Sequence, residues 1–132
     1  MATFSQYVLD NEGNPVVETD TTLWAKTLSD IKRRRVALTD FFSGVKISTV
    51  FLGINHGTEE KPLFFETRVE GKGAIEDETQ RWATWADALE GHRMAVQEVL
   101  DVDHKVRRNE EWARPTVPRK SQWDRLTDDD DL

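Results

Sequence analysis

Apolar and polar positions alternate most regularly between residues 45 and 70. This stretch reads VKISTVFLGI, then the polar connection NHGTEEK, then PLFFETRVE. The last run separates apolar or small side chains from charged ones on the two sides of an extended chain: Leu63, Phe65, Thr67 and Val69 against Glu66, Arg68 and Glu70. This pattern predicts a β-hairpin in a sheet with one packed face and one face in water.

The first arm of the hairpin is apolar on both faces near its end, where Val50, Phe51, Leu52 and Ile54 follow closely on one another. A strand of this kind is typical of the middle of a sheet. Shorter extended runs at residues 6–9, 16–17 and 36–41 are candidate strands. We therefore expect an antiparallel sheet of three to five strands, centred on residues 45–70.

Two stretches have helical spacing. Thr84 followed by Asp87 forms a capping pattern before a long apolar stripe, which consists of Trp85, Ala88, Leu89, His92, Val96, Val99 and Leu100. Gly91 interrupts this helix at a cost of roughly 1 kcal/mol relative to alanine, for which close packing on the sheet is the ordinary reason. A second helix is expected at residues 22–33, with a shared face made of Leu23, Trp24, Thr27, Leu28 and Ile31.

Together these elements predict a two-layer α+β fold in one domain of residues 1–103. The helix of residues 85–100 should pack across the sheet, and the helix of residues 22–33 should cover an edge or the same face. Residues 104–132 are charged, contain two prolines and read as a tail. Trp112 and Trp123 in this tail either anchor a partner or pack back on the domain.

The composition excludes several kinds of functional site. The chain has 132 residues and no cysteine, so disulfides, thiolate metal sites and cysteine nucleophiles are excluded. No apolar run approaches the ~18 residues of a membrane span, and the first residues lack the pattern of a signal peptide. We therefore expect a cytoplasmic protein without a membrane partner.

The net charge of −7 disfavours non-specific binding of DNA or RNA, because an acidic surface repels phosphates. The charge is uneven, however, and residues 32–35 form a basic block. Arg34 and Arg35 in this block offer forked donors to a small anionic ligand. The alternative interpretation is a solvated helix end.

Two histidines are candidate site residues. His56 lies in the hairpin connection and either contacts a ligand or is a polar turn residue. His92 lies on the apolar stripe and is either a core residue or, facing the hairpin, a partner of Glu66 or Arg68. A histidine–glutamate pair would suit a small hydrolase. No phosphate-binding loop, nucleophile elbow, zinc-protease motif or dinucleotide fingerprint is present, and we expect no metal and no cofactor.

Several strings of residues occur together in a familiar order. These are STVFLG at residues 48–53 followed by His56, LFFET at residues 63–67, and Thr84-Trp85 followed by Gly91-His92. Their order resembles a widespread family of small bacteriophage proteins, over roughly residues 7–98. The family has an aspartate before the loop histidine, where this chain has Asn55. This difference argues against a carboxylate–histidine site in the loop.

The resemblance implies a phage-encoded protein in the host cytoplasm. By analogy, we expect a non-enzymatic accessory protein that binds a host protein or a small anionic, nucleotide-like ligand and counteracts host defence. Its expected ligand contacts are His56, Glu66, Arg68, His92, Arg34 and Arg35, and its expected partner anchors are Trp112 and Trp123. The alternatives are a virion component that is tied in by its tail and forms homo-oligomers, and a small hydrolase that uses His56 or His92 with Glu66.

Overall fold

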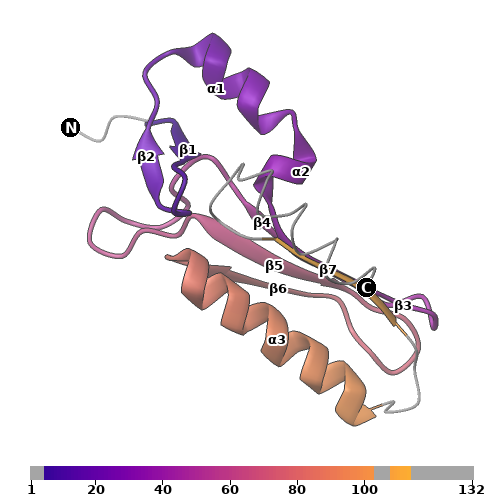
Figure 1. Ribbon diagram of the computed structural model, residues 1–132. Coiled ribbons are helices and arrows are strands. Elements are labelled where there is room, and N and C mark those ends of the chain that lie inside the picture. Colours follow the sequence, from indigo (N-terminus) through magenta and orange to yellow (C-terminus); the bar gives the residue numbers. More distant parts are fainter. Residues whose placement is uncertain (1–4, 103–107, 114–132) are drawn as a thin grey trace.

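The computed structural model describes residues 5–102 and 108–113 (Figure 1). Within these residues, a five-stranded antiparallel sheet has the order β6-β5-β4-β3-β7. Its strands are β3 (Arg35–Phe41), β4 (Lys46–Phe51), β5 (Phe65–Glu70), β6 (Glu78–Trp82) and β7 (Arg108–Trp112). Helix α3 (Trp85–Val102) packs on one face of this sheet. The expected α+β fold is confirmed, with the strand number at the top of the expected range.

The central hairpin forms as the alternation predicts. Strands β4 and β5 pair in register, with Ile47 opposite Val69 and Phe51 opposite Phe65. These four side chains are buried beneath α3. Because β4 is the middle strand of the five, the prediction that the first arm is central is also confirmed.

The two edge strands were not predicted from the sequence. Strand β6 pairs with β5, and β7 pairs with β3. Most side chains of both strands are exposed, so neither has the apolar alternation of a half-buried strand. Charged side chains are common at sheet edges because they discourage pairing with other chains. The sheet thus includes residues 108–112, beyond the domain boundary expected at residue 103.

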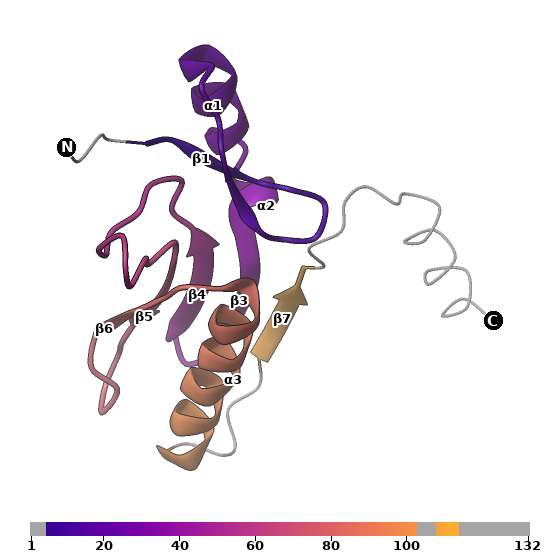
Figure 2. The ribbon, with the colours of Figure 1, turned by 90° about the vertical axis from the view of Figure 1, so that its left-hand side faces the viewer.

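Helix α3 begins where its capping pattern predicts. The Thr84 hydroxyl oxygen accepts a hydrogen bond of 3.0 Å from the backbone N–H of Asp87, which satisfies one of the free donors of the first turn. The buried face of the helix consists of Ala88, Gly91, His92, Ala95, Val96 and Val99. Figure 2 shows this helix running along the sheet.

Buried apolar side chains form two clusters at opposite ends of the covered face. One cluster contains Phe41, Val45, Ile47, Val69, Ala95, Val96 and Val99. The other contains Val36, Phe51, Phe64, Phe65 and Ala88. Thr39, Thr49 and Thr67 occupy the middle of their three strands between the clusters, opposite His92 of α3. The core is therefore apolar at both ends and polar across its centre.

The N-terminal residues form a separate layer at one end of the sheet (Figure 1). It consists of the hairpin of β1 (Tyr7–Leu9) and β2 (Pro15–Val17), followed by α1 (Thr21–Leu28) and α2 (Ile31–Arg34). The backbone N–H of Tyr7 and the indole N–H of Trp24 both donate to the carbonyl of Gly53, at 2.8 and 3.1 Å. This layer is therefore fastened to the chain just beyond the end of β4.

The helix expected at residues 22–33 is two helices. Asp30 has an extended backbone, and its carboxylate accepts a hydrogen bond of 3.1 Å from the N–H of Lys32. Ser29 donates its hydroxyl proton to the carbonyl of Lys26 at 2.7 Å. Short polar side chains that bond to nearby backbone compete with a continuous helix. This local competition ends α1 and starts α2.

Candidate ligand pocket

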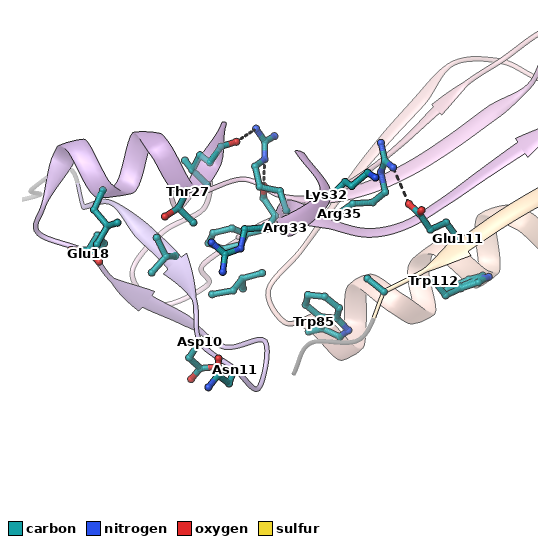
Figure 3. A pocket seen from close by; sticks show the side chains of 17 residues that line it. Asp10, Asn11, Glu18, Thr27, Lys32, Arg33, Arg35, Trp85, Glu111 and Trp112 are labelled. Carbon is teal, nitrogen blue, oxygen red and sulfur yellow. Dashed lines mark hydrogen bonds and ion pairs between the residues drawn. The ribbon is translucent and has the colours of Figure 1, made fainter. Parts of the chain in front are cut away.

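A cavity of about 700 Å³ lies where the N-terminal layer meets the sheet (Figure 3). Its walls come from β1, α1, α2, the start of β3, the end of β4, the start of α3 and the end of β7. The volume is within the range of pockets that hold small ligands. The lining residues are distant in sequence, so the cavity exists only because the N-terminal layer is fastened beside Gly53.

One wall of the pocket is basic. It consists of the consecutive side chains Lys32, Arg33, Arg34 and Arg35, where α2 runs into β3. Within the described residues, the side chains of Lys32 and Arg33 make no hydrogen bond or ion pair. Both cations are therefore available to an incoming anion.

Arg35 is only partly satisfied by its neighbours. Its Nη1 forms an ion pair of 2.9 Å with Oε1 of Glu111, and the side chains are 21% and 59% exposed, respectively. The Arg35 Nε atom is buried and has no hydrogen-bond partner among the described residues. A guanidinium can form two parallel hydrogen bonds to one anion. The Arg35 guanidinium forms a single bond, to the exposed Glu111 carboxylate, and so has donors left for a second anion.

Arg34 is not the free anion contact that the sequence suggested. Its Nε donates to the carbonyl of Phe51 and its Nη1 donates to the carbonyl of Leu28, both at 3.2 Å. The first carbonyl belongs to the last residue of β4 and the second to the last residue of α1. Arg34 therefore ties α1 to the sheet and holds the pocket open between them.

Replacing Arg34 with methionine is expected to lower the free energy of unfolding by about 2 kcal/mol. The change keeps the aliphatic stem and removes two hydrogen bonds from a charged donor, which are worth roughly 1.5–3 kcal/mol each at most. Urea unfolding followed by tryptophan fluorescence measures the loss. The matched control is Arg68→Met, because Arg68 is exposed on β5. An equal loss in both variants would contradict the bridging role of Arg34.

The rest of the pocket is apolar, with polar side chains from the N-terminal hairpin. Leu9 and Leu28 provide aliphatic surface and Trp85 of α3 contributes an indole, whereas Phe51, at 1% exposure, belongs to the core behind this wall. Side chains with oxygen atoms reach the pocket from the N-terminal hairpin: Asp10 and Asn11 from its turn, and Glu18 from its other end (Figure 3). The backbone N–H groups of Asn14 and Glu12 hold the pKa of the Asp10 carboxyl below its usual value. Asp10 is therefore a carboxylate at neutral pH.

His92 is a buried core residue that bonds to two strands. Its Nε2 lies 2.9 Å from the hydroxyl of Thr39, and its Nδ1 lies 2.8 Å from the hydroxyl of Thr49. The imidazole is fully buried, and its ring packs edge-on against Trp112 with a centroid distance of 4.8 Å. This burial and these bonds match the interpretation of His92 as a core residue. They give no support to a catalytic or ligand-binding role.

The hydrogen bonds around His92 have one consistent direction. Thr39 donates its proton to the Glu110 carboxylate at 3.3 Å, so Nε2 of His92 must donate to Thr39. A neutral imidazole then accepts at Nδ1 from Thr49. The Trp82 indole N–H donates to Thr67, which lies 2.6 Å from Thr49. The hydrogen bonds therefore form one chain in which each group donates to the next. The chain runs from Trp82 through Thr67, Thr49, His92 and Thr39 to the Glu110 carboxylate, which only accepts.

The other predicted ligand contacts are not brought together. His56 is exposed in a loop that the Asn55 side chain organises through bonds to the backbone of Gly57 and Leu63. Glu66 faces away from α3 and forms an ion pair of 3.0 Å with Arg81. The pairing of His92 with Glu66 that a hydrolase would need is not formed, because the two side chains lie on opposite faces of β5's sheet.

Arg68 and the two candidate partner anchors are placed differently. Arg68 is exposed on the face of the sheet opposite α3. Trp112 packs against His92 and lies beneath the guanidinium of Arg93, 5.5 Å from the ring centroid. It therefore packs back on the domain, which is one of the two roles that the sequence left open. Trp123 lies outside the described residues.

No protein-family model, curated protein or solved structure matches the chain. In the described part of the chain, no helix is both long and apolar enough to cross a membrane. The same residues contain no group of three or more histidine, aspartate or glutamate side chains arranged to hold a metal ion. The similarity to bacteriophage proteins stays a prediction.

Proposed function

We propose that the protein is a non-enzymatic binding protein that holds a small anionic ligand in the pocket beside residues 32–35. The observation that carries this proposal is a basic wall in a cavity of about 700 Å³. On this wall, Lys32 and Arg33 have no partner among the described residues, and Arg35 makes one ion pair while its buried Nε has no partner there. A concave site of this size, open on one side and lined by apolar surface with a few polar groups, is typical of ligand-binding proteins. A catalytic role has less support, because the histidine–glutamate pair is not assembled.

The electrostatics of the pocket support an anionic ligand despite the net charge of −7. Arg34 is bonded to backbone carbonyls and Arg35 is paired with Glu111. Lys32 and Arg33 are therefore the exposed cations of the pocket, whereas the Asp10 carboxylate lies at the turn of the N-terminal hairpin (Figure 3). A local cluster of one sign beside an apolar surface concentrates the field where solvent is partly excluded. The basic wall therefore favours anions within an otherwise acidic molecule.

The resemblance to bacteriophage proteins gives this proposal a biological setting. A phage protein that binds a host nucleotide without converting it removes that nucleotide from host signalling. Such sequestration needs a pocket and no catalytic group. We therefore propose sequestration in the host cytoplasm as the way in which this chain counteracts host defence.

The test is a titration of the protein with pyrophosphate and adenosine monophosphate, followed by calorimetry. The double variant Lys32→Gln/Arg33→Gln is expected to bind at least about tenfold more weakly, because each charge near a partly screened site contributes on the order of 1 kcal/mol or more. The double variant Lys46→Gln/Arg68→Gln is the matched control, since it also removes two exposed cations and neither lines the pocket. Binding should also weaken with added salt.

Two results would overturn the proposal. One is the lack of measurable binding of either anion at millimolar concentration by the intact chain. The other is an equal loss of affinity in Lys32→Gln/Arg33→Gln and in Lys46→Gln/Arg68→Gln, because binding would then follow the net charge of the protein. A thermal melt of each variant confirms that it is folded before affinities are compared.

A further inference from the structure

Strand β7 brings the chain to the basic side of the pocket. It runs antiparallel to β3, from a start opposite Phe41 to Trp112 opposite Ala37, so its direction leads toward α2 (Figure 2). The backbone N–H of Ala113 then donates to the carbonyl of Val36 at 2.8 Å, and Ala113 itself lines the pocket. The chain therefore leaves the sheet at the wall of the pocket.

The basic block at residues 32–35 comes directly before Val36, where the chain leaves the sheet. Its four cations outnumber the carboxylates that line the pocket, which are Asp10, Glu18 and Glu111. Arg35 is paired with Glu111, and Arg34 is bonded to two backbone carbonyls. Lys32 and Arg33 are exposed, and their side chains have no partner in the part of the chain that the structure describes. The exit of the chain is therefore next to two adjacent cations that no carboxylate pairs there.

The sequence beyond Ala113 contains a segment of the opposite charge. Residues 128–131 are four consecutive aspartates, and the first of them is 15 residues beyond Ala113. A chain of this length spans up to about 50 Å when extended, so the aspartates are within covalent reach of the whole pocket. A group tethered by a linker of this length has an effective concentration on the order of millimolar. Even a weak ionic contact is populated at such a concentration.

We infer that the acidic segment of residues 128–131 binds in the pocket of its own chain, with its carboxylates on Lys32 and Arg33. Neighbouring carboxylates match neighbouring cations, and the apolar surface beside them reduces the screening of the contact by water and salt. The inference uses the cations of the proposed anion site but does not require that a free ligand binds there. It adds that any anion must displace the chain's own acidic segment.

Other cations of the chain fit the acidic segment less well. Three arginines of the described residues already have a carboxylate partner: Arg81, Arg93 and Arg108. Lys46 and Arg68 are exposed but lie outside the pocket. Lys120 and its neighbour Arg119 are closer to the aspartates in sequence, and they are the competitors that an experiment must distinguish. Lys32 and Arg33 differ from the described cations above in being adjacent, exposed and beside the exit of the chain.

Zero-length cross-linking of the full chain tests the contact directly. A water-soluble carbodiimide joins a carboxylate to an amine as an amide, so a link forms only where the two groups touch. Peptide mass spectrometry of the cross-linked monomer is expected to find residues 128–131 joined to Lys32 far more often than to Lys46, which is exposed outside the pocket. Links to Lys32 that are no more frequent than links to Lys46 would overturn the inference. Links confined to Lys120 would overturn it as well.

Competition with pyrophosphate measures how far the segment occupies the pocket. The full-length variant in which all four aspartates of residues 128–131 are replaced by asparagine is expected to bind pyrophosphate at least about threefold more tightly, which corresponds to a pocket that is free in about a third of the unchanged molecules. The matched control removes four exposed carboxylates that do not line this pocket: Glu70→Gln, Glu76→Gln, Glu78→Gln and Glu98→Gln. At physiological salt these distant charges are largely screened, so the control should bind like the unchanged chain.

The outcomes separate this inference from the proposed function. Equal affinity for pyrophosphate in the unchanged chain and in the asparagine variant overturns the inference and leaves anion binding standing. An equal gain in the asparagine variant and in its control also overturns it, because affinity would then follow the net charge. If pyrophosphate binds to none of these proteins, the proposed function fails, and the cross-links to Lys32 still decide whether the acidic segment occupies the pocket.

Discussion

Replacing Gly91 with valine is expected to lower the free energy of unfolding by about 3 kcal/mol or more. A Cβ atom at this position in α3 would lie only 2.3 Å from Cζ2 and 2.4 Å from Cε2 of Trp82. Real Cβ atoms do not approach other carbons so closely, so the helix or the indole must move. Inserting atoms into a filled core costs typically 1–3 kcal/mol, and valine inserts three carbons.

The Trp82 indole has little freedom to withdraw from Gly91. Its Nε1 donates a hydrogen bond of 2.9 Å to the hydroxyl of Thr67, which is buried in the middle strands. Moving the ring breaks this bond and leaves a polar group of the core without its donor. Gly91 therefore lowers the intrinsic stability of the helix, and this cost is offset because α3 can pack directly on the Trp82 indole.

The measurement is chemical unfolding of Gly91→Ala and Gly91→Val beside the unchanged protein. Helix propensity alone would make alanine more stable than glycine by roughly 1 kcal/mol. The exposed helix position Met94 calibrates that term, through the difference between Met94→Gly and Met94→Ala. If Gly91→Ala gained as much stability as the Met94 pair predicts, the close packing on Trp82 would have no energetic role.

The core elements are predictable because their burial leaves a periodic pattern. Strands β4 and β5 alternate, and α3 has a capped apolar stripe, so these elements and their contact follow from local sequence. Strands β6 and β7 carry no such pattern, since most of their side chains are exposed. Edge strands gain most of their stability from backbone hydrogen bonds, which any sequence can make. Their position is therefore decided by the rest of the sheet.

The polar centre of the core has a sequence signal that alternation alone does not reveal. Each of the three central strands has a threonine two residues away from buried apolar side chains, at positions 39, 49 and 67. Threonine suits a strand and is tolerated in a core when its hydroxyl is bonded. His92 on the facing stripe of α3 bonds the hydroxyls of Thr39 and Thr49. The hydroxyl of Thr67 is bonded by Thr49 and Trp82. Buried threonines on three neighbouring strands, with Thr49 opposite Thr67 and Thr39 displaced by two residues, thus correspond to His92 as a core residue.

The candidate pocket depends on contacts that no local pattern contains. The basic block at residues 32–35 is visible in the sequence, but which cation remains free depends on the backbone carbonyls of Leu28 and Phe51. These carbonyls engage Arg34, whereas Lys32 and Arg33 have no side-chain partner in the part of the chain that the structure describes. Asp10 and Asn11 likewise reach the pocket from the β1–β2 turn. The place of this hairpin beside β4 is set by the bond from Tyr7 to the carbonyl of Gly53.

Acidification is expected to remove up to about 3 kcal/mol of stability through His92 between pH 6.5 and pH 4. Burial lowers the pKa of His92 from 6.5 to about 4, against an opposing effect of the Glu110 carboxylate. In this window the unfolded chain binds a proton on the imidazole and the folded chain does not, so the free energy of unfolding falls as the pH falls. Each unit of difference in pKa is worth about 1.4 kcal/mol.

The direction of the hydrogen bonds around His92 is an independent reason for the free energy of unfolding to fall with the pH. A protonated imidazole would have to donate at Nδ1, which now accepts from Thr49. Thr49 would then turn its proton toward Thr67, whose oxygen already accepts from Trp82. The Thr67 hydroxyl would in turn lose the acceptor it now uses. Charging His92 therefore costs both desolvation and a reversal of the buried hydroxyls.

Urea unfolding at several pH values from 7 to 4 tests this prediction against His92→Gln. Glutamine has a carbonyl oxygen that accepts and an NH2 group that donates, so it can replace both roles of the neutral imidazole, and it carries no titrating group. The variant is expected to lose stability less steeply than the unchanged protein in this window, and His56→Gln, which removes an exposed histidine, should follow the unchanged protein. Carboxylates titrate in all three proteins, so the difference between the curves isolates His92. Parallel curves for His92→Gln and the unchanged protein would show that the buried network tolerates a proton on His92.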